Sequence, residues 1–312
     1  MRIETDGYVV GLIEKDLVMG RDTLHLAKNK MSVDTSGRCT NLYLNGQGHT
    51  IYGLNMSRAM FYCVENLVEN LTIANSRFES DNGLSAAGDK LGTDGGTISG
   101  CTNSGMILGN GSGSVSIGGI AGYAHRTTFD SLKNTGLIEG KSTSGSLTVG
   151  GIVGRLDSTQ NVIDCGNWGR VHALSGKKVY AGGVVGLYNG DFQMMGEKLS
   201  GTSWLVSSYN YGPVTVKESE DFAYAGGLAG YITGSLISAD YNRGTVKNEG
   251  SSKNRYTGSL AALVDWCSVA GNYSYVDTLT GSHTASLVYE FAGTNNSMYR
   301  SYYGGVEVPP CR

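Results

Sequence analysis

The sequence predicts an all-β fold, a parallel β-helix (β-solenoid) with coils of about 32 residues. Three observations predict it. The chain has 48 Gly and only 3 Pro among 312 residues, and one glycine motif and one asparagine motif recur with the same period. Between them lie short aliphatic or β-branched runs, while helical periodicity is hard to find. We expect one repeat to form one coil, and residues 1–312 to form a single domain.

The composition narrows the class of protein. Many glycines allow tight corners with positive φ, and few prolines leave the backbone donors of a strand ladder intact. Glycine does not recur at every third position, which excludes collagen, and 40% hydrophobic residues argue against a disordered linker. A net charge of −3 with scattered charges predicts no nucleic-acid partner.

No segment has the length or flanks of a membrane span or a signal peptide. The chain is therefore either cytosolic or, as we prefer, a fragment of a longer secreted chain. In the second case its location is extracellular or on the cell surface, and further domains are covalently joined to it.

The first repeated column is Gly-Gly-apolar-apolar-Gly, which we expect to form a strand. Successive copies start 32, 32 and 44 residues apart, and a degenerate copy at Gly258 follows after a further 32 residues. The paired glycines are Gly118 and Gly119, Gly150 and Gly151, Gly182 and Gly183, and Gly226 and Gly227.

The second repeated column is Asn-x-Gly, which we expect to form a turn. Its members are Asn103, Asn134, Asn167, Asn210 and Asn242, with Asn272 as a last copy that lacks its glycine. Stacked coils place each residue about 4.8 Å from its neighbours along the axis, so the amides can bond up and down the stack. Asn and Gly also tolerate left-handed backbone at turns. We therefore interpret these asparagines as structural.

Both columns contain the same long interval, which indicates an insertion within residues 189–203. An insertion that leaves both columns in phase must be a loop outside the stacked strands. It contains Phe192, Met194 and Met195, which we take as candidate partner-binding residues.

The ends of the chain are less regular. Residues 1–80 are expected to form narrower first coils, with strand, turn and strand in 42–54 and another strand in 68–73. Residues 83–88 look like a degenerate copy of the glycine column. The regular repeats would occupy 81–275, and 276–312 would form the C-terminal coils and the end of the domain.

The Gly-Gly-Ile-Val-Gly and Asn-x-Gly columns resemble the GLUG-motif repeats of bacterial surface proteins, which include adhesin-like proteins and the N-terminal region of immunoglobulin A1 protease-type proteins. The resemblance covers roughly residues 40–275. It implies a right-handed β-helix on the bacterial surface and no catalytic residue. Ser259 and Ala262 depart from the glycine pattern, which suggests a fraying or capping end.

Residues that could carry chemistry are scattered. None of the six cysteines has zinc-type spacing. Cys101 and Cys165 share a column, but two coils place them about 9.6 Å apart, too far for a disulfide. The five histidines fill different phases of the repeat, and His49 is interpreted as a structural turn residue. We predict no catalytic residue, no metal ligand and no cofactor.

Carboxylates stacked on one sheet would indicate a polysaccharide lyase or glycosidase. Asp130, Asp164 and Asp240 are the candidates, but they precede their asparagines by four, three and two residues and so cannot form one column.

Tyrosine is the one conspicuous side chain, with 19 copies. Many lie near the asparagine turns: Tyr209, Tyr211, Tyr241, Tyr273, Tyr275, Tyr302 and Tyr303, with Trp168 in the same setting. They either pack as an aromatic ladder that covers the glycine-rich sheet, or form an exposed stripe for sugar rings or a protein partner. Tyr209, Tyr211, Tyr241 and Tyr273 are our candidate partner-binding residues on this surface.

The preferred function is non-enzymatic: an adhesin-like scaffold or stalk that presents the loop and the tyrosines to a host extracellular protein or glycan. Two alternatives remain open. A polysaccharide-active β-helix enzyme would require acids that converge in a groove, and a phage tail-fibre β-helix would form a stable trimer.

Overall fold

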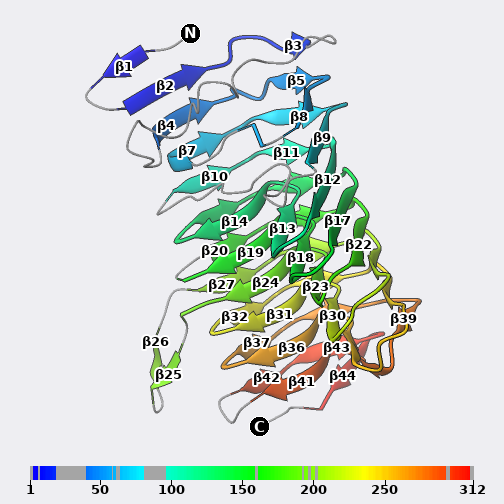
Figure 1. Ribbon diagram of the computed structural model, residues 1–312. Helices are drawn as coiled ribbons and strands as arrows, with labels where there is room; N and C mark the ends of the chain where they lie inside the picture. Colours follow the sequence, from blue (N-terminus) through cyan, green and yellow to red (C-terminus); the bar gives the residue numbers. More distant parts are fainter. Residues whose placement is uncertain are drawn as a thin grey trace.

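The computed structural model describes residues 3–5, 8–18, 40–57, 59–60, 64–80, 96–158, 161–191, 193–195, 198–200, 203–292 and 296–309. These residues form a parallel β-helix in which the coils are stacked in chain order from the N-terminus to the C-terminus (Figure 1). Five long sheets run along the stack, and the described residues contain no helix. The predicted all-β solenoid is confirmed.

Two sheets of 11 strands extend from the first coil to the last. Sheet I contains, in spatial order, β1 (Ile3–Thr5), β2 (Tyr8–Leu12), β4 (Thr40–Asn45), β7 (Val64–Glu69), β10 (Thr97–Ser99), β15 (Thr128–Asp130), β20 (Asn161–Ile163), β27 (Trp204–Val206), β32 (Leu236–Ser238), β37 (Ser268–Ala270) and β42 (Ser297–Tyr299). Sheet II contains β3 (Leu17–Val18), β5 (Thr50–Tyr52), β8 (Thr72–Ala74), β11 (Thr102–Asn103), β16 (Lys133–Asn134), β21 (Gly166–Asn167), β28 (Tyr209–Asn210), β33 (Tyr241–Asn242), β38 (Tyr273–Ser274), β43 (Ser301–Tyr303) and β44 (Val306–Val308).

Sheet III has eight strands and begins one coil later. It contains β6 (Asn55–Met56), β9 (Arg77–Ser80), β12 (Met106–Gly111), β17 (Ile138–Ser142), β22 (Val171–Ser175), β29 (Val214–Val216), β34 (Val246–Asn248) and β39 (Leu279–Thr280).

Sheets IV and V have six strands each and start only with the regular repeats. Sheet IV contains β13 (Val115–Gly118), β18 (Leu147–Gly150), β23 (Lys178–Gly182), β30 (Phe222–Gly226), β35 (Arg255–Gly258) and β40 (His283–Ala285). Sheet V contains β14 (Ala121–His125), β19 (Val153–Asp157), β24 (Val185–Asn189), β31 (Ala229–Thr233), β36 (Ala261–Asp265) and β41 (Val288–Ala292).

The described residues of the first coils supply strands only to sheets I, II and III. Parallel stacking already begins at β2, which pairs with β4. The predicted strand at 68–73 is divided between β7 and β8 by Asn70, whose φ is 54°. At the two ends, β1 pairs with β2 and β44 with β43, both antiparallel. The degenerate copy of the glycine column at 83–88 lies outside the described residues.

Aliphatic side chains that point inward from all five sheets form one continuous core. Cys101, Cys165 and Cys267 are buried in it as free thiols, and burial raises the pKa of Cys101 to about 11. Leu132 fills the coil between Cys101 and Cys165, so the predicted spacing that forbids a disulfide is confirmed. Cys39, Cys63 and Cys311 lie outside the described residues.

The predicted asparagines form a buried ladder in sheet II. The Nδ2 of each asparagine before Asn242 donates to Oδ1 of the next one at 2.8–2.9 Å, and all five donate to the carbonyl of the glycine two residues later. The predicted bonding along the stack is thus confirmed for Asn103, Asn134, Asn167, Asn210 and Asn242. Asn272 was wrongly placed, because β33 and β38 pair Asn242 with Ser274. Asn272 instead follows Asp240 in the neighbouring column.

The prediction of left-handed backbone at the asparagine motif was wrong. None of the five ladder asparagines has a positive φ. One column of left-handed residues instead follows the strands of sheet I, at the corner with sheet II, with φ between 47° and 63°. They are Asn70, Gly100, Ser131, Asp164, Ser207, Ala239, Gly271 and Arg300. This corner recurs in space without a fixed residue type, so it left no column in the sequence.

The Gly-Gly motif is a corner rather than the predicted strand. Gly150 ends β18, and β19 begins at Val153. Its second glycine is required by close approach: a Cβ on Gly151 would lie 2.1 Å from the carbonyl oxygen of Gly183 and 2.4 Å from Cγ of Asn167. The glycine column and the asparagine ladder therefore meet across the interior of the solenoid.

This contact explains why the glycine pattern changes at Ser259 while the coils continue. Asn242 has no asparagine beyond it, since Ser274 stands there, and its Nδ2 donates to the Ser259 carbonyl at 2.7 Å. The smaller Ser274 removes the carboxamide that every earlier second glycine faces. A Cβ at position 259 is then tolerated.

Candidate functional site

The tyrosines that were predicted as a partner-binding surface come together on sheet II. Tyr209, Tyr241, Tyr273 and Tyr302 occupy one register position, one on each successive coil. A second column is formed by the middle residues of the Asn-x-Gly motifs. We call the combined surface the sheet II stripe; it consists of Trp168, Tyr209, Tyr211, Tyr241, Tyr273, Tyr275 and Tyr302.

Rings of the sheet II stripe touch mainly at steep angles. Trp168 and Tyr209 meet at 81° with centroids 5.0 Å apart, and Tyr211 and Tyr241 at 53°. Only Trp168 with Tyr211 (11°) and Tyr273 with Tyr302 (7°) are stacked. Tyr211, Tyr273 and Tyr275 are each 44% exposed. The stripe is therefore partly exposed to solvent, and its binding of sugar rings or a protein partner stays a prediction.

Two cations belong to the same surface. Lys133 Nζ lies 4.5 Å above the Trp168 ring, a cation–π contact. Arg243 occupies the middle position of its Asn-x-Gly motif, in the column of Tyr211 and Tyr275, and it is exposed. Partial burial is the main cause that raises the pKa of Tyr209, with the Asp164 charge as a smaller cause.

A second aromatic cluster was missed at the sequence level. Sheet IV carries a column of rings that stack face to face: Tyr180 on Tyr224 (5.6 Å, 13°), Tyr224 on Tyr256 (5.1 Å, 18°) and Tyr256 on His283 (5.1 Å, 27°). Tyr231 of sheet V packs beside it. We call this the corner stripe. Desolvation raises the pKa of Tyr224 to about 12.

The corner stripe covers the glycine corner, on the side of the solenoid opposite sheet II. An aromatic ladder over the glycine-rich sheet was one of the two interpretations of the tyrosines near the asparagine turns. The corner stripe forms such a ladder instead. A signal was present, since Tyr180 and Tyr224 both stand two residues before a Gly-Gly pair. Aligning these tyrosines by their position before the Gly-Gly pair would have revealed the corner stripe as a third repeated column.

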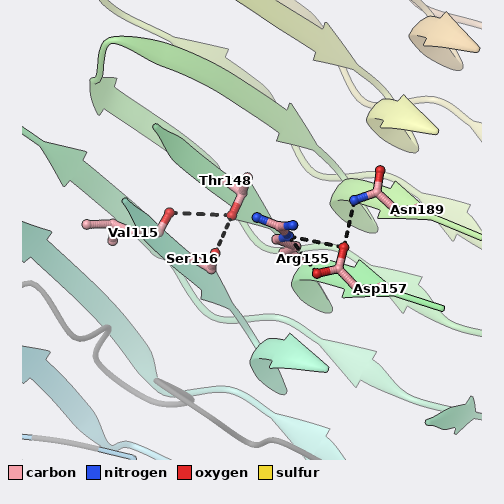
Figure 2. A network of polar contacts seen from close by, with 6 residues as sticks. All are labelled: Val115, Ser116, Thr148, Arg155, Asp157 and Asn189. Carbon is pink, nitrogen blue, oxygen red and sulfur yellow. Dashed lines mark hydrogen bonds and ion pairs between the residues drawn. The ribbon is translucent and has the colours of Figure 1, made fainter. Parts of the chain in front are cut away.

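Beside the corner stripe, polar side chains tie adjacent coils together on sheets IV and V (Figure 2). The guanidinium of Arg155 contacts the carboxylate of Asp157 at 3.0 Å, and Asn189 Nδ2 donates to Asp157 Oδ1 at 2.6 Å. Thr148 Oγ1 donates to Ser116 Oγ at 2.7 Å. This network joins neighbouring repeats and has a structural role.

The predicted insertion is a hairpin outside the stack. It consists of β25 (Gln193–Met195) and β26 (Lys198–Ser200), which pair antiparallel and project from the solenoid (Figure 1). Its base is closed where Asp191 N donates to Ser203 Oγ at 2.9 Å.

The hairpin residues chosen as candidates are only partly described. Met194 and Met195 lie in β25, but their side chains and the whole of Phe192 lie outside the described residues. The hairpin leaves between sheets V and I, so sheet I separates it from the sheet II stripe. The two predicted partner-binding features are thus on different sheets.

The three candidate acids do not converge. Asp130 ends β15 and hydrogen-bonds to Ser131, whereas Asp164 occupies the left-handed corner after β20. Asp240 is fully buried in the core. The predicted difference in phase is confirmed, and these three residues do not form a carboxylate pair.

The described histidines lie apart, as their phases indicated. His49 Nδ1 lies 3.3 Å from Asp16 Oδ1, and His172 Nδ1 lies 3.1 Å from Glu139 Oε2. Across the described part of the chain, no group of three or more His, Cys, Asp or Glu side chains is placed to hold a metal ion. That part also contains no helix long and apolar enough to cross a bilayer.

Asp240 is the most perturbed acid. Ser208 N donates to its Oδ1 at 2.7 Å, while Oδ2 has no hydrogen-bond partner among the described residues. Burial raises the pKa of this carboxyl well above its usual range. The folded state then binds a proton more tightly than the unfolded state, so stability falls as pH rises from about 4 toward the folded pKa.

We expect Asp240→Asn to raise stability at neutral pH and to flatten this pH dependence, because the amide is neutral throughout. Asn272, which stands at the same position in the next coil, shows that the site accepts an amide. Thermal unfolding of both proteins between pH 4 and 8 is the measurement. Identical pH profiles would show that Asp240 does not titrate in this range.

Comparison with known proteins supports the fold. No family model matches the chain, and no curated protein matches it. Among solved structures, a "putative immunoglobulin A1 protease" from Bacteroides ovatus matches with a TM-score of 0.56 and 17% sequence identity, over 77% of this chain and 71% of that chain. At this identity the likeness shows the β-helical fold alone. It agrees with the immunoglobulin A1 protease side of the predicted resemblance, whereas membership of the GLUG repeats stays a prediction.

Proposed function

We propose that this chain is a non-enzymatic β-helical module of a bacterial surface or secreted protein, and that it presents its sheet II stripe and its hairpin to a host extracellular protein or glycan. The observation that supports it most is the sheet II stripe. Tyr211, Tyr273 and Tyr275 are each 44% exposed, whereas the large aliphatic side chains of the same coils are buried or half-buried. Exposed aromatic surface of this kind marks interaction sites.

In this proposal the module is part of a longer parent chain, acts outside the cell and needs no cofactor. The resemblance of its motifs to surface repeats supports this setting. So does the likeness to a solved structure named for an immunoglobulin A1 protease, because such a protein would act on a host target. The solenoid supplies a stiff support in which each coil contacts only its neighbours.

The hairpin can be removed cleanly to test its part in this function. Deleting residues 191–202 joins Gly190 to Ser203, which reproduces the connection Gly234-Ser235 one coil further on. Because the hairpin lies outside the stack, we expect the thermal midpoint to change by less than about 2 °C, a difference worth under about 1 kcal/mol. Circular dichroism melting measures it.

The same variant tests partner binding. The intact chain and the deletion variant are each used to capture ligands from a panel of host extracellular proteins and a glycan array. Capture by the intact chain supports the proposed function, and its loss on deletion assigns it to the hairpin. If the intact chain captures no ligand from either panel, the module serves only as a spacer.

A further inference from the structure

We propose that the sheet II stripe binds an extended polysaccharide that lies parallel to the solenoid axis. This inference rests on the proposed function and names the class of partner that the stripe takes. Four properties of the surface support it: the chemistry of its exposed side chains, the orientation of their rings, their spacing and their charge.

The first property is that the exposed large hydrophobic side chains are all aromatic. Within the described residues from 96 to 305, every large hydrophobic side chain with high exposure is a Trp or a Tyr. A protein interface is enriched in Phe and Met as well as in Tyr, Trp and Arg. A pyranose has an apolar C–H face and a polar rim, and an aromatic ring with a polar edge matches both.

The second property is the ring orientation. A ring with neighbours stacked on both faces offers only its edge, as Tyr224 does in the corner stripe between Tyr180 and Tyr256. In the sheet II stripe most contacts are tilted, for example 43° between Tyr241 and Tyr275. Tilted packing leaves part of a ring face uncovered. The sheet II stripe can therefore stack a sugar, whereas the corner stripe serves packing.

The third property is the spacing. Tyr209, Tyr241, Tyr273 and Tyr302 are paired from coil to coil, so one ring follows another about every 4.8 Å. A sugar unit in an extended β-1,4-linked chain is about as long as this rise. Successive sugars would meet successive coils. A chain lying across the axis would reach the rings of one coil only.

The fourth property is charge. Arg243 interrupts the column between Tyr211 and Tyr275, and Lys133 lies over Trp168 at the N-terminal end of the stripe. A guanidinium offers a planar fork of donors that fits a carboxylate. Two acids adjoin the ends of the stripe: Asp164 acts on Tyr209, and the exposed Glu307 of β44 is paired with Tyr302, so Arg243 supplies the charge between them. We expect chains with carboxylates to bind more tightly than neutral ones.

The test uses two probes of equal length, a β-1,4-linked mannuronate hexamer and cellohexaose, titrated into the full chain by calorimetry. We expect the mannuronate hexamer to bind, Tyr211→Ala and Tyr275→Ala each to weaken it about tenfold, and Arg243→Ala to weaken it more than it weakens cellohexaose. Tyr299→Ala is the matched control, since Tyr299 is 49% exposed on β42 outside the stripe, and it should bind as the parent does. Circular dichroism verifies the fold of each variant.

Failure of both hexamers to bind at millimolar concentration would overturn this inference, as would undiminished binding by Tyr211→Ala. If cellohexaose binding depends on Tyr211 but the mannuronate hexamer binds no more tightly, polysaccharide binding by the stripe is supported and its preference for carboxylates is contradicted. If neither hexamer binds but the chain captures a host protein, the proposed function stands and only the polysaccharide fails.

Discussion

Gly151→Ala is expected to destabilise the solenoid by about 3 kcal/mol or more. The added Cβ would lie 2.1 Å from the Gly183 carbonyl oxygen and 2.4 Å from Cγ of Asn167. The first neighbour is backbone in a parallel stack, and the second is held on both sides by the ladder. Neither can rotate away, so two adjacent coils must separate.

The damage should remain local, because each coil of a solenoid contacts only its neighbours. Hydrogen exchange is expected to show lost amide protection in the coils of Gly151 and Gly183, with protection retained around residues 260–270. The thermal midpoint should also fall. Gly113→Ala is the control, since a Cβ there meets nothing within 4 Å. It should leave the midpoint unchanged or slightly raised. Equal effects of the two substitutions would contradict the role assigned to the glycine column.

The period of the fold could be predicted from the sequence because the ladder and the glycine corner each demand one residue type. Only Asn offers a donor and an acceptor that can bond along the stack and to its own turn, and only Gly fits where a Cβ would meet the next coil. These requirements repeat on every coil. They therefore appear as two columns in phase.

Other parts of the fold left no such trace. The corner between sheets I and II is left-handed at Ser131, Asp164 and Ala239 alike. Its conformation is imposed by the stacked strands on either side, so no residue type marks it. The five-sheet cross-section was equally hidden, because strands of two to six residues give too few positions for an alternating pattern.

The alignment of the candidate tyrosines could be predicted from the sequence, whereas their role in binding stays a prediction. Tyr209, Tyr241 and Tyr273 were found because they adjoin the asparagine column, and the structure places them in one row. These tyrosines and the hairpin lie on different sheets. The repeat in the sequence does not show from which sheet a loop projects, so this separation could not be predicted. The acids were correctly judged to be out of phase. The burial of Asp240 was missed although the sequence carried a signal, since Asp240 stands two residues before its asparagine, as the buried Cys101 and Cys165 do.

The second large effect is expected for Asn167→Ala. Asn167 is fully buried, its Nδ2 donates to Gly169 O and Asn210 Oδ1 at 2.8 Å each, and its Oδ1 accepts from Asn134 Nδ2 at 2.8 Å. The substitution breaks the ladder at its centre, leaves buried polar groups without partners and opens a cavity. Each unsatisfied buried group costs about 1–3 kcal/mol, so we expect a loss of about 3 kcal/mol or more.

Asn254→Ala is the matched control, because Asn254 is an exposed asparagine that donates one side-chain hydrogen bond, to Asp221 O at 3.1 Å. It should cost less than about 1 kcal/mol. Asn167→Asp separates the loss of hydrogen bonds from the loss of side-chain volume. The aspartate keeps the shape of the asparagine side chain but directs an acceptor oxygen at Asn210 Oδ1. We expect it to be as harmful as alanine at pH 7 and to recover part of its stability at low pH, where the protonated carboxyl regains one donor. Equal thermal midpoints for Asn167→Ala and Asn254→Ala would show that the ladder adds no stability beyond the strands that carry it.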